Sequence, residues 1–269
     1  ACRLPFFEAR REVTQPAVCA DCHDPASMRL RLTRPAFLAR HQGDYPLQQL
    51  RSLVCAQCHA EYYLNPRTLV VSHPWERGFG VDDMERYYDG NRHIDWTHPE
   101  TGAPLLKAQH PQFEMWRQGV HARGGAACAD CHMPYERRGS VLVTDHSAHS
   151  PRENIERACL RCHLGDARSM RERLALIQQR TARLSAAALR ALMDLFDGFH
   201  RAQLAGVPDS KLAGARTFHR KAQWRLDFIL ADRSQGFHAP QESARILAEA
   251  LDYARQGQLE LQKLTPTSP

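Results

Sequence analysis

Cys19-Ala-Asp-Cys22-His23 is the first of four copies of one pentapeptide pattern in this chain of 269 residues. The other copies are Cys55-Ala-Gln-Cys58-His59, Cys128-Ala-Asp-Cys131-His132 and Cys159-Leu-Arg-Cys162-His163. The pattern is typical of c-type haem attachment, in which two thiols one turn apart add to the haem vinyl groups and the next imidazole binds the iron. Four copies predict a chain that folds around four covalent haems.

Zinc sites and disulfides are the alternatives to haem for so many cysteines. A zinc site closes one tetrahedron of Cys and His ligands and does not require a histidine after every second cysteine. A disulfide across two intervening residues is a redox motif that is rarely repeated four times. Both alternatives are therefore disfavoured, and Cys2 is the one cysteine outside the pattern.

Each low-spin haem needs a second axial ligand. Eleven histidines lie outside the four motifs, and six methionines are the competing supply. With four irons to ligate in so short a chain, ligation by two histidines is favoured, and it predicts low reduction potentials.

The composition changes sharply after the last motif, which predicts two regions. Residues 1–165 hold all four motifs at unequal intervals, so no fixed-period repeat is present. Residues 166–269 are rich in Ala, Leu, Arg and Gln. We expect a mainly α fold: short helices and loops around haems in 1–165, then long antiparallel helices in 166–269.

Apolar residues recur at steps of three and four along the start of the second region, as in a long helix with a narrow seam. The seam residues are Leu174, Ile177, Thr181, Leu184, Ala188, Leu192, Leu195 and Phe199. The segment 206–209 interrupts this helix, a second helix is expected over about 210–231, and a third near Pro240, which suits a first helical turn. The seam either packs within the chain or forms a subunit interface.

Composition excludes several classes of function. The formal charge is +6, but the basic residues are mostly scattered arginines, which argues against nucleic-acid binding. Four haems would add roughly −8 through their propionates and leave the loaded protein mildly acidic. The longest apolar runs are too short for a membrane span.

Further motifs accompany the haem motifs in a set order. They are Cys58-His59-Ala60-Glu61-Tyr62-Tyr63, Lys107-Ala108-Gln109-His110-Pro111, Cys131-His132-Met133-Pro134, Thr144-Asp145-His146 and Phe237-His238-Ala239-Pro240. In these segments the chain resembles the pentahaem cytochrome c nitrite reductases, enzymes that reduce nitrite to ammonium. The resemblance extends from about Phe6 to about Leu261.

The resemblance implies a site made of several parts. It implies calcium bound by the Glu61 carboxylate, the backbone carbonyls of Tyr62 and Lys107, and the Gln109 side chain, an all-oxygen set that suits this ion. Tyr62 and His110 match the residues that act on nitrite. 

Distal haem ligands also follow from the resemblance. His121, His146 and His238 match the ligands of the haems at Cys159/Cys162, Cys19/Cys22 and Cys128/Cys131, in that order. The motif histidines His23, His59, His132 and His163 are the proximal ligands.

The chain departs from this family in one respect. The family's catalytic haem is attached through a Cys-x-x-Cys-Lys motif, and none of the four lysines here follows a cysteine pair. The family's active-site arginine and the distal ligand of the haem at Cys55/Cys58 also lack a counterpart. One hypothesis is a truncated nitrite reductase, with its fifth haem on preceding sequence. The alternative is a tetrahaem electron-transfer cytochrome without the catalytic haem.

The resemblance also implies a cellular location, an oligomeric state and an electron donor. Haem c is attached on the outer side of the bacterial inner membrane, so a periplasmic location is expected. We expect a homodimer formed through the long helices, with electrons arriving from a multihaem quinol-oxidising or soluble cytochrome partner.

Overall fold

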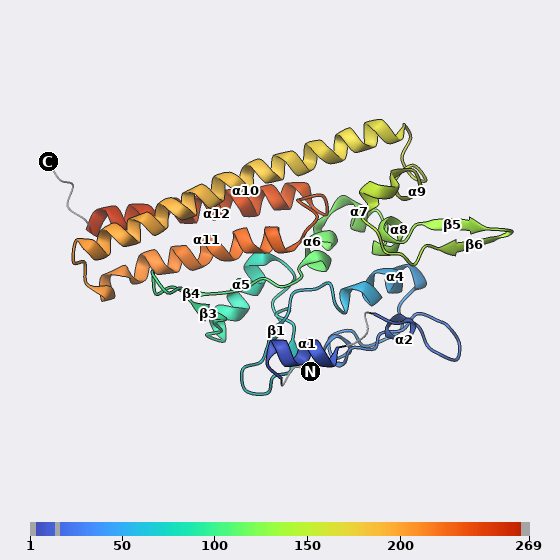
Figure 1. The fold of residues 1–269 in the computed structure, drawn as a ribbon, viewed down its shortest axis with the longest axis horizontal. Helices are drawn as coiled ribbons and strands as arrows, with labels where there is room; N and C mark the ends of the chain where they lie inside the picture. Colours follow the sequence, from blue (N-terminus) through green and yellow to red (C-terminus); the bar gives the residue numbers. More distant parts are fainter. Residues whose placement is uncertain (1–3, 14–16, 265–269) are drawn as a thin grey trace. The chain divides into compact units, whose positions relative to one another are not determined.

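The structure is a computed structural model that describes residues 4–13 and 17–264; Cys2 lies outside the described residues. The described chain is mainly helical, as the sequence predicts, and it also contains short two-stranded hairpins, which were not predicted (Figure 1). It forms two compact units, each assembled from two separate segments. Unit 1 comprises residues 1–73 and 120–174, and unit 2 comprises residues 74–119 and 175–269.

Unit 1 consists of short elements joined by loops, because the motifs and prolines interrupt any long periodic pattern. Its helices are α1 (Phe6–Glu12), α2 (Cys19–Cys22), α3 (Pro35–Leu38), α4 (Leu47–Ala56), α7 (Val120–Arg123), α8 (Cys128–His132), η1 (Pro151–Asn154) and α9 (Ile155–Ala158). Its antiparallel hairpins pair β1 (Tyr63–Leu64) with β2 (Val71–Ser72), and β5 (Tyr135–Arg138) with β6 (Val141–Thr144).

Unit 2 is built on long helices. They are most of α10 (Ala167–Leu204), α11 (Ala213–Ala231) and α12 (Pro240–Leu264), which run side by side in Figure 1. Its shorter elements are α5 (Val81–Gly90), α6 (Gln112–Gln118), η2 (Asp209–Leu212) and the hairpin of β3 (Trp96–Thr97) with β4 (Pro104–Leu105). Helix α12 begins at Pro240, as expected for proline in a first turn.

The α10 seam packs within unit 2. Thr181, Ala188, Leu192, Leu195 and Phe199 are buried, whereas Leu184 is exposed. Helix α12 carries Gly257 opposite Leu195, where a Cβ would crowd the leucine side chain, so the two helices approach closely there. The part of the seam from Thr181 to Phe199 therefore serves intrachain packing.

A buried arginine on α11 forms ion pairs with neighbouring helices of unit 2. The side chain of Arg225 is 2% exposed, and its guanidinium donates to Glu85 of α5 at 3.1 Å and to Glu249 of α12 at 2.8 Å. Trp224, fully buried beside it, donates from Nε1 to the carbonyl of Val81 at 3.1 Å. A buried charge is tolerated because it is paired and hydrogen-bonded.

Candidate functional site

The four Cys-x-x-Cys-His motifs adopt the turn that their proposed chemistry requires. In three of them the backbone amide of the histidine donates to the carbonyl of the first cysteine: His23 at 2.8 Å, His59 at 2.9 Å and His163 at 3.0 Å. The fourth histidine, His132, lies inside α8. Both thiols of each motif therefore lie one turn apart, and the motif cysteines form no disulfides with one another.

Thiols of successive motifs are electrostatic neighbours within unit 1. Burial raises the pKa of the Cys22 thiol, and the charges of Asp21 and Cys58 raise it further. A hydrogen bond with Cys128, followed by burial, raises the pKa of Cys55. Burial raises the pKa of Cys131 to about 12, with Cys159 of the last motif adding to it. Thiols of successive motifs are therefore close enough to raise one another's pKa.

Arginine–aspartate pairs fix the motifs to their surroundings. Asp21, inside the first motif, accepts from Arg34 at 2.8 Å, and Asp130, inside the third, accepts from Arg51 of α4 at 2.8 Å. Arg51 also hydrogen-bonds the Tyr135 hydroxyl, and its guanidinium carbon lies 4.6 Å from the centre of that ring. Because α4 ends in the second motif, Arg51 links the second motif to the third.

Two pairs of histidine rings in unit 1 have the separation that a shared metal ion would impose. The ring centres of His23 and His146 are 6.1 Å apart, and those of His121 and His163 are 6.0 Å apart. A metal–imidazole bond of about 2 Å, plus roughly 1.1 Å from nitrogen to ring centre, puts two opposed ligand rings about 6 Å apart. Both pairs therefore fit an iron between two imidazoles.

The hydrogen bonds of these histidines suit the same chemistry. Nδ1 of His23 bonds the carbonyl of Met28 at 2.7 Å, Nδ1 of His146 the carbonyl of Thr144 at 2.8 Å, and Nδ1 of His132 the carbonyl of His149 at 3.1 Å. A carbonyl only accepts hydrogen bonds, so each Nδ1 carries the hydrogen. In this tautomer Nε2 has the lone pair that can bind a metal. This is the usual arrangement of a metal-binding histidine.

Unit 1 contains little apolar core of its own. Among its described residues, the buried apolar side chains larger than alanine are Phe37, Leu53 and Ile155. A folded region of this length ordinarily buries many more, because apolar burial is the main force that stabilises a domain. Four haems would supply the missing apolar surface, so the residues present fit the cofactor.

His238 follows a tight loop after α11 in unit 2. Its Nδ1 lies 2.6 Å from Oδ1 of Asp232, whose side chain is fully buried. Ser234 lies between them in sequence; its hydroxyl donates to Asp232 and accepts from the backbone amide of His238 at 3.1 Å. The His238 ring is therefore held by a carboxylate.

Glu61 and Tyr62 lie just after the second motif in unit 1. Glu61 is completely buried, and its backbone carbonyl is bonded by Nδ1 of His73 at 2.9 Å. Burial lowers the pKa of His73, so the imidazole is neutral and donates this hydrogen bond. A buried carboxylate needs cations or hydrogen-bond donors around it, and a calcium ion would fit that requirement.

The segment with Lys107, Gln109 and His110 belongs to unit 2 and is anchored to α11. Asp227 accepts from the Lys107 ammonium at 2.8 Å and from the Ala108 amide at 2.9 Å. The Lys107 amide donates to Asp95 at 2.8 Å. The Lys107 ammonium is thus bound to Asp227. The group of Lys107 that could bind a metal ion is its backbone carbonyl.

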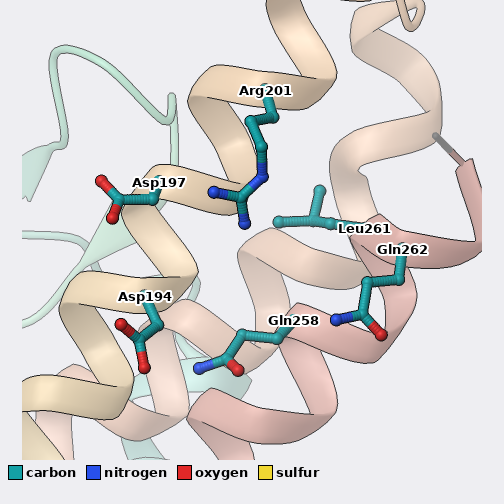
Figure 2. A pocket seen from close by; sticks show the side chains of 7 residues that line it. Asp194, Asp197, Arg201, Gln258, Leu261 and Gln262 are labelled. Atoms are coloured by element: carbon teal, nitrogen blue, oxygen red, sulfur yellow. The ribbon is translucent and has the colours of Figure 1, made fainter. Parts of the chain in front are cut away.

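Among the described residues, no group of three or more His, Cys, Asp or Glu side chains gathers as a metal cluster. The predicted calcium set would not form such a group, because it contains one carboxylate. In unit 2 a hollow of 220 Å³ lies between α10 and α12 and is lined by Asp194, Asp197, Arg201 and Gln258 (Figure 2). It includes none of the predicted site residues.

A chain with four such motifs, paired imidazoles and a sparse apolar core is a multihaem c-type cytochrome. The model of the cytochrome c552 family matches residues 3–268, and the chain belongs to that family. No helix among the described residues combines the length and the hydrophobicity needed to cross a membrane.

Relatives and a solved structure agree with this assignment. The chain is 40% identical over 262 residues to cytochrome c-552 of Bacteroides fragilis strain YCH46, covering 94% of this chain and 52% of that protein. It is 37% identical over 262 residues to cytochrome c-552 of Porphyromonas gingivalis, with the same coverage. The chain therefore spans about half the length of these curated relatives.

The solved structure is that of cytochrome c nitrite reductase from Desulfovibrio desulfuricans, whose catalytic subunit has two calcium sites. It superposes with a TM-score of 0.85 at 31% identity, covering 92% of this chain and 57% of that one.

The structure adds residues that sequence reasoning missed. Asp232, Asp227 and Arg51 were not singled out, although each contacts a predicted site residue or motif. Only Asp232, six residues before His238, lies close enough in sequence to have been suspected. Asp227 and Arg51 bond partners 120 and 79 residues away, and no local pattern marks them.

Proposed function

We propose that this chain carries four haems and part of the active site of an ammonia-forming cytochrome c nitrite reductase. The observation that carries the proposal is the pair of ring separations, 6.1 Å for His23 with His146 and 6.0 Å for His121 with His163. Both pairs join a motif histidine to the distal histidine that the resemblance assigns to it. The 31% identity to a nitrite reductase of the same fold supports nitrite as the substrate.

The haems supply the electrons for the six-electron reduction of nitrite, and this chain holds them in order. His23, His59, His132 and His163 are the proximal ligands, and His121, His146 and His238 are distal ligands. Because thiols of successive motifs are close enough to affect one another's pKa, these motifs would hold haems near one another, which would suit electron transfer between them. Two histidines on one iron favour the low potentials that such a path requires.

Tyr62 and His110 act on the substrate. Both side chains can donate a proton to an oxygen of nitrite, as general acids do. Glu61, Gln109 and the carbonyls of Tyr62 and Lys107 hold calcium, whose positive charge favours the bound anion and fixes these backbones. The buried Glu61, with its carbonyl bonded by His73, and the anchoring of Lys107 on Asp227 support this assignment.

The reductase activity is proposed for the protein in which these residues are joined to a lysine-ligated haem. The four motifs all end in histidine, and this observation favours a second candidate. In that candidate the protein is a tetrahaem electron-transfer cytochrome, and the haems conduct without reducing nitrite.

We also propose a periplasmic homodimer that accepts electrons from a multihaem quinol-oxidising or soluble cytochrome. Helix α10 supports the dimer: beyond its buried seam it exposes Leu176, Leu189 and Met193. These apolar side chains would be covered in a dimer. Light scattering of the haem-loaded protein gives twice the chain mass in this case, and a monomer mass contradicts it.

The test of function uses the haem-loaded product of the gene, together with any sequence that adjoins this chain. With reduced methyl viologen as the donor, we expect nitrite to be consumed and ammonium to form in equal amounts. His110→Ala should lower kcat at least a hundredfold, within the usual contribution of an acid–base group, while the haem absorption stays unchanged. Absence of ammonium from the wild-type protein, with all haems present and reducible, would favour the electron-transfer cytochrome.

A further inference from the structure

His238, a predicted haem ligand in unit 2, hydrogen-bonds a carboxylate that is shielded from solvent. Oδ1 of Asp232 lies 2.6 Å from Nδ1 of His238, and the carboxyl side chain is 0% exposed. An ionised carboxylate only accepts hydrogen bonds, so Nδ1 carries the hydrogen. A metal bound to this ring is therefore bound through Nε2.

The loop around this contact is built to hold it. Ser234 bonds both partners, donating to Asp232 and accepting from the His238 amide. Gly236 has φ of +84°, and a Cβ there would overlap the Thr181 side chain of α10. At Gly119, a Cβ would overlap the carbonyl oxygen of His238. This close packing fixes the backbone that carries the His238 ring.

Other predicted haem ligands use weaker partners. Nδ1 of His23, His132 and His146 each bonds a backbone carbonyl, at 2.7, 3.1 and 2.8 Å. A carbonyl is a neutral acceptor, whereas Asp232 brings a full negative charge. Hydrogen bonds to an ionised acceptor are about twice as strong as neutral ones. The imidazole of His238 is therefore the more electron-rich ligand.

We propose that Asp232 is a positioning residue that orients His238 and lowers the reduction potential of the haem that His238 binds. The proposal rests on the proposed function, in which His238 is a distal haem ligand. A more basic imidazole and a nearby negative charge both stabilise ferric over ferrous iron. The haem that His238 binds is thereby held at a lower potential than the haem at Cys19/Cys22, whose ligands His23 and His146 each bond a backbone carbonyl through Nδ1.

The first test compares the haem-loaded wild type with Asp232→Asn and Asp197→Asn by spectroelectrochemical titration. Asparagine at 232 keeps an acceptor oxygen but removes the charge. We expect one haem to become at least tenfold easier to reduce, a rise of about 59 mV for a one-electron couple, while the other haems do not move. Asp197→Asn removes an exposed carboxylate from α10 and should leave every potential within error.

Ser234→Ala gives a second, milder perturbation. It removes one hydrogen bond that Asp232 accepts and leaves its charge, so the carboxylate becomes a stronger acceptor for the His238 N–H and we expect the potential of the same haem to fall, opposite to Asp232→Asn. Unchanged potentials in both Asp232→Asn and Ser234→Ala, with haem content and low-spin spectra equal to wild type, would overturn the proposal.

Failure of the proposed function would look different from failure of this inference. If His238 is not a haem ligand, His238→Ala leaves the spin state of every haem as in the wild type. If His238 is a ligand but Asp232 does not tune it, His238→Ala converts one haem to high-spin while Asp232→Asn changes no potential.

Discussion

Removal of His146 tests the histidine pairing of unit 1 directly. The ring centres of His146 and His23 are 6.1 Å apart, so half of that distance, about 3 Å, separates each ring centre from a midpoint iron. Subtracting roughly 1.1 Å from ring centre to nitrogen leaves a bond of about 2 Å, as in metal–imidazole sites. His146→Ala removes one of these two ligands and leaves His23 in place.

The size of the effect follows from the number of motifs. One of four irons should lose its sixth ligand, so about a quarter of the haem signal should change from low-spin to high-spin. Ferric electron paramagnetic resonance and the visible spectrum both report this change. Added imidazole should restore the low-spin state, because it occupies the space that the side chain leaves.

His149→Ala is the matched control, since His149 lies three residues further along the same loop. The His149 ring is about half exposed, and its Nδ1 lies 3.8 Å from a carboxylate oxygen of Glu153. His149 is not a predicted haem ligand. The control should keep the wild-type spectrum. A His146→Ala protein whose low-spin signal equals that of the wild type without added imidazole would refute the pairing.

Three further perturbations probe unit 2. Gly119→Ala should destabilise the protein by about 1–3 kcal/mol, because the new Cβ overlaps the carbonyl oxygen of His238 and the backbone must shift; chemical denaturation measures this. Asp227→Asn should weaken calcium binding about tenfold, since the anchor of Lys107 loses its charge; calorimetric titration measures it. Burial lowers the pKa of His219 to about 3. His219 is therefore protonated below about pH 6.5 in the unfolded state but stays neutral in the folded state. Stability should fall by about 1.4 kcal/mol per pH unit below 6.5 through this group, and His219→Phe should remove that slope.

Each of these predictions has a control in the same unit. Gly90→Ala places a Cβ 3.6 Å from a flexible arginine side chain and should be tolerated. Asp252→Asn removes an exposed carboxylate from α12 and should leave calcium affinity unchanged. A Gly119→Ala protein as stable as Gly90→Ala, equal calcium affinities in Asp227→Asn and Asp252→Asn, or the same acid slope with and without His219 would each count against the corresponding argument.

Periodic and covalent features of this protein were predictable from sequence. The motifs predict their own turns, because two thiols must lie on one side of a short helix. The seam of α10 predicts the burial of Thr181, Ala188, Leu192, Leu195 and Phe199, although its member Leu184 is exposed, and Pro240 predicts the start of α12. In each case the signal lies within a few residues.

Contacts between distant segments were not predictable in this way. Arg51 meets Asp130 across 79 residues and Lys107 meets Asp227 across 120, and single charged residues carry no pattern that names their partner. The seam alone did not choose between intrachain packing and a subunit interface, because both bury the same side chains. The choice depends on Gly257 of α12, which lets that helix come close to Leu195.

The central claim is that four haems are covalently bound to this chain through its four Cys-x-x-Cys-His motifs. Intact mass spectrometry of protein matured in a host with a cytochrome c assembly system measures this directly. We expect the polypeptide mass increased by that of four haem groups, with the haem peptides mapping to Cys19/Cys22, Cys55/Cys58, Cys128/Cys131 and Cys159/Cys162. A mass increase of fewer than four haems, or iron bound with the thiols unmodified, would contradict the account.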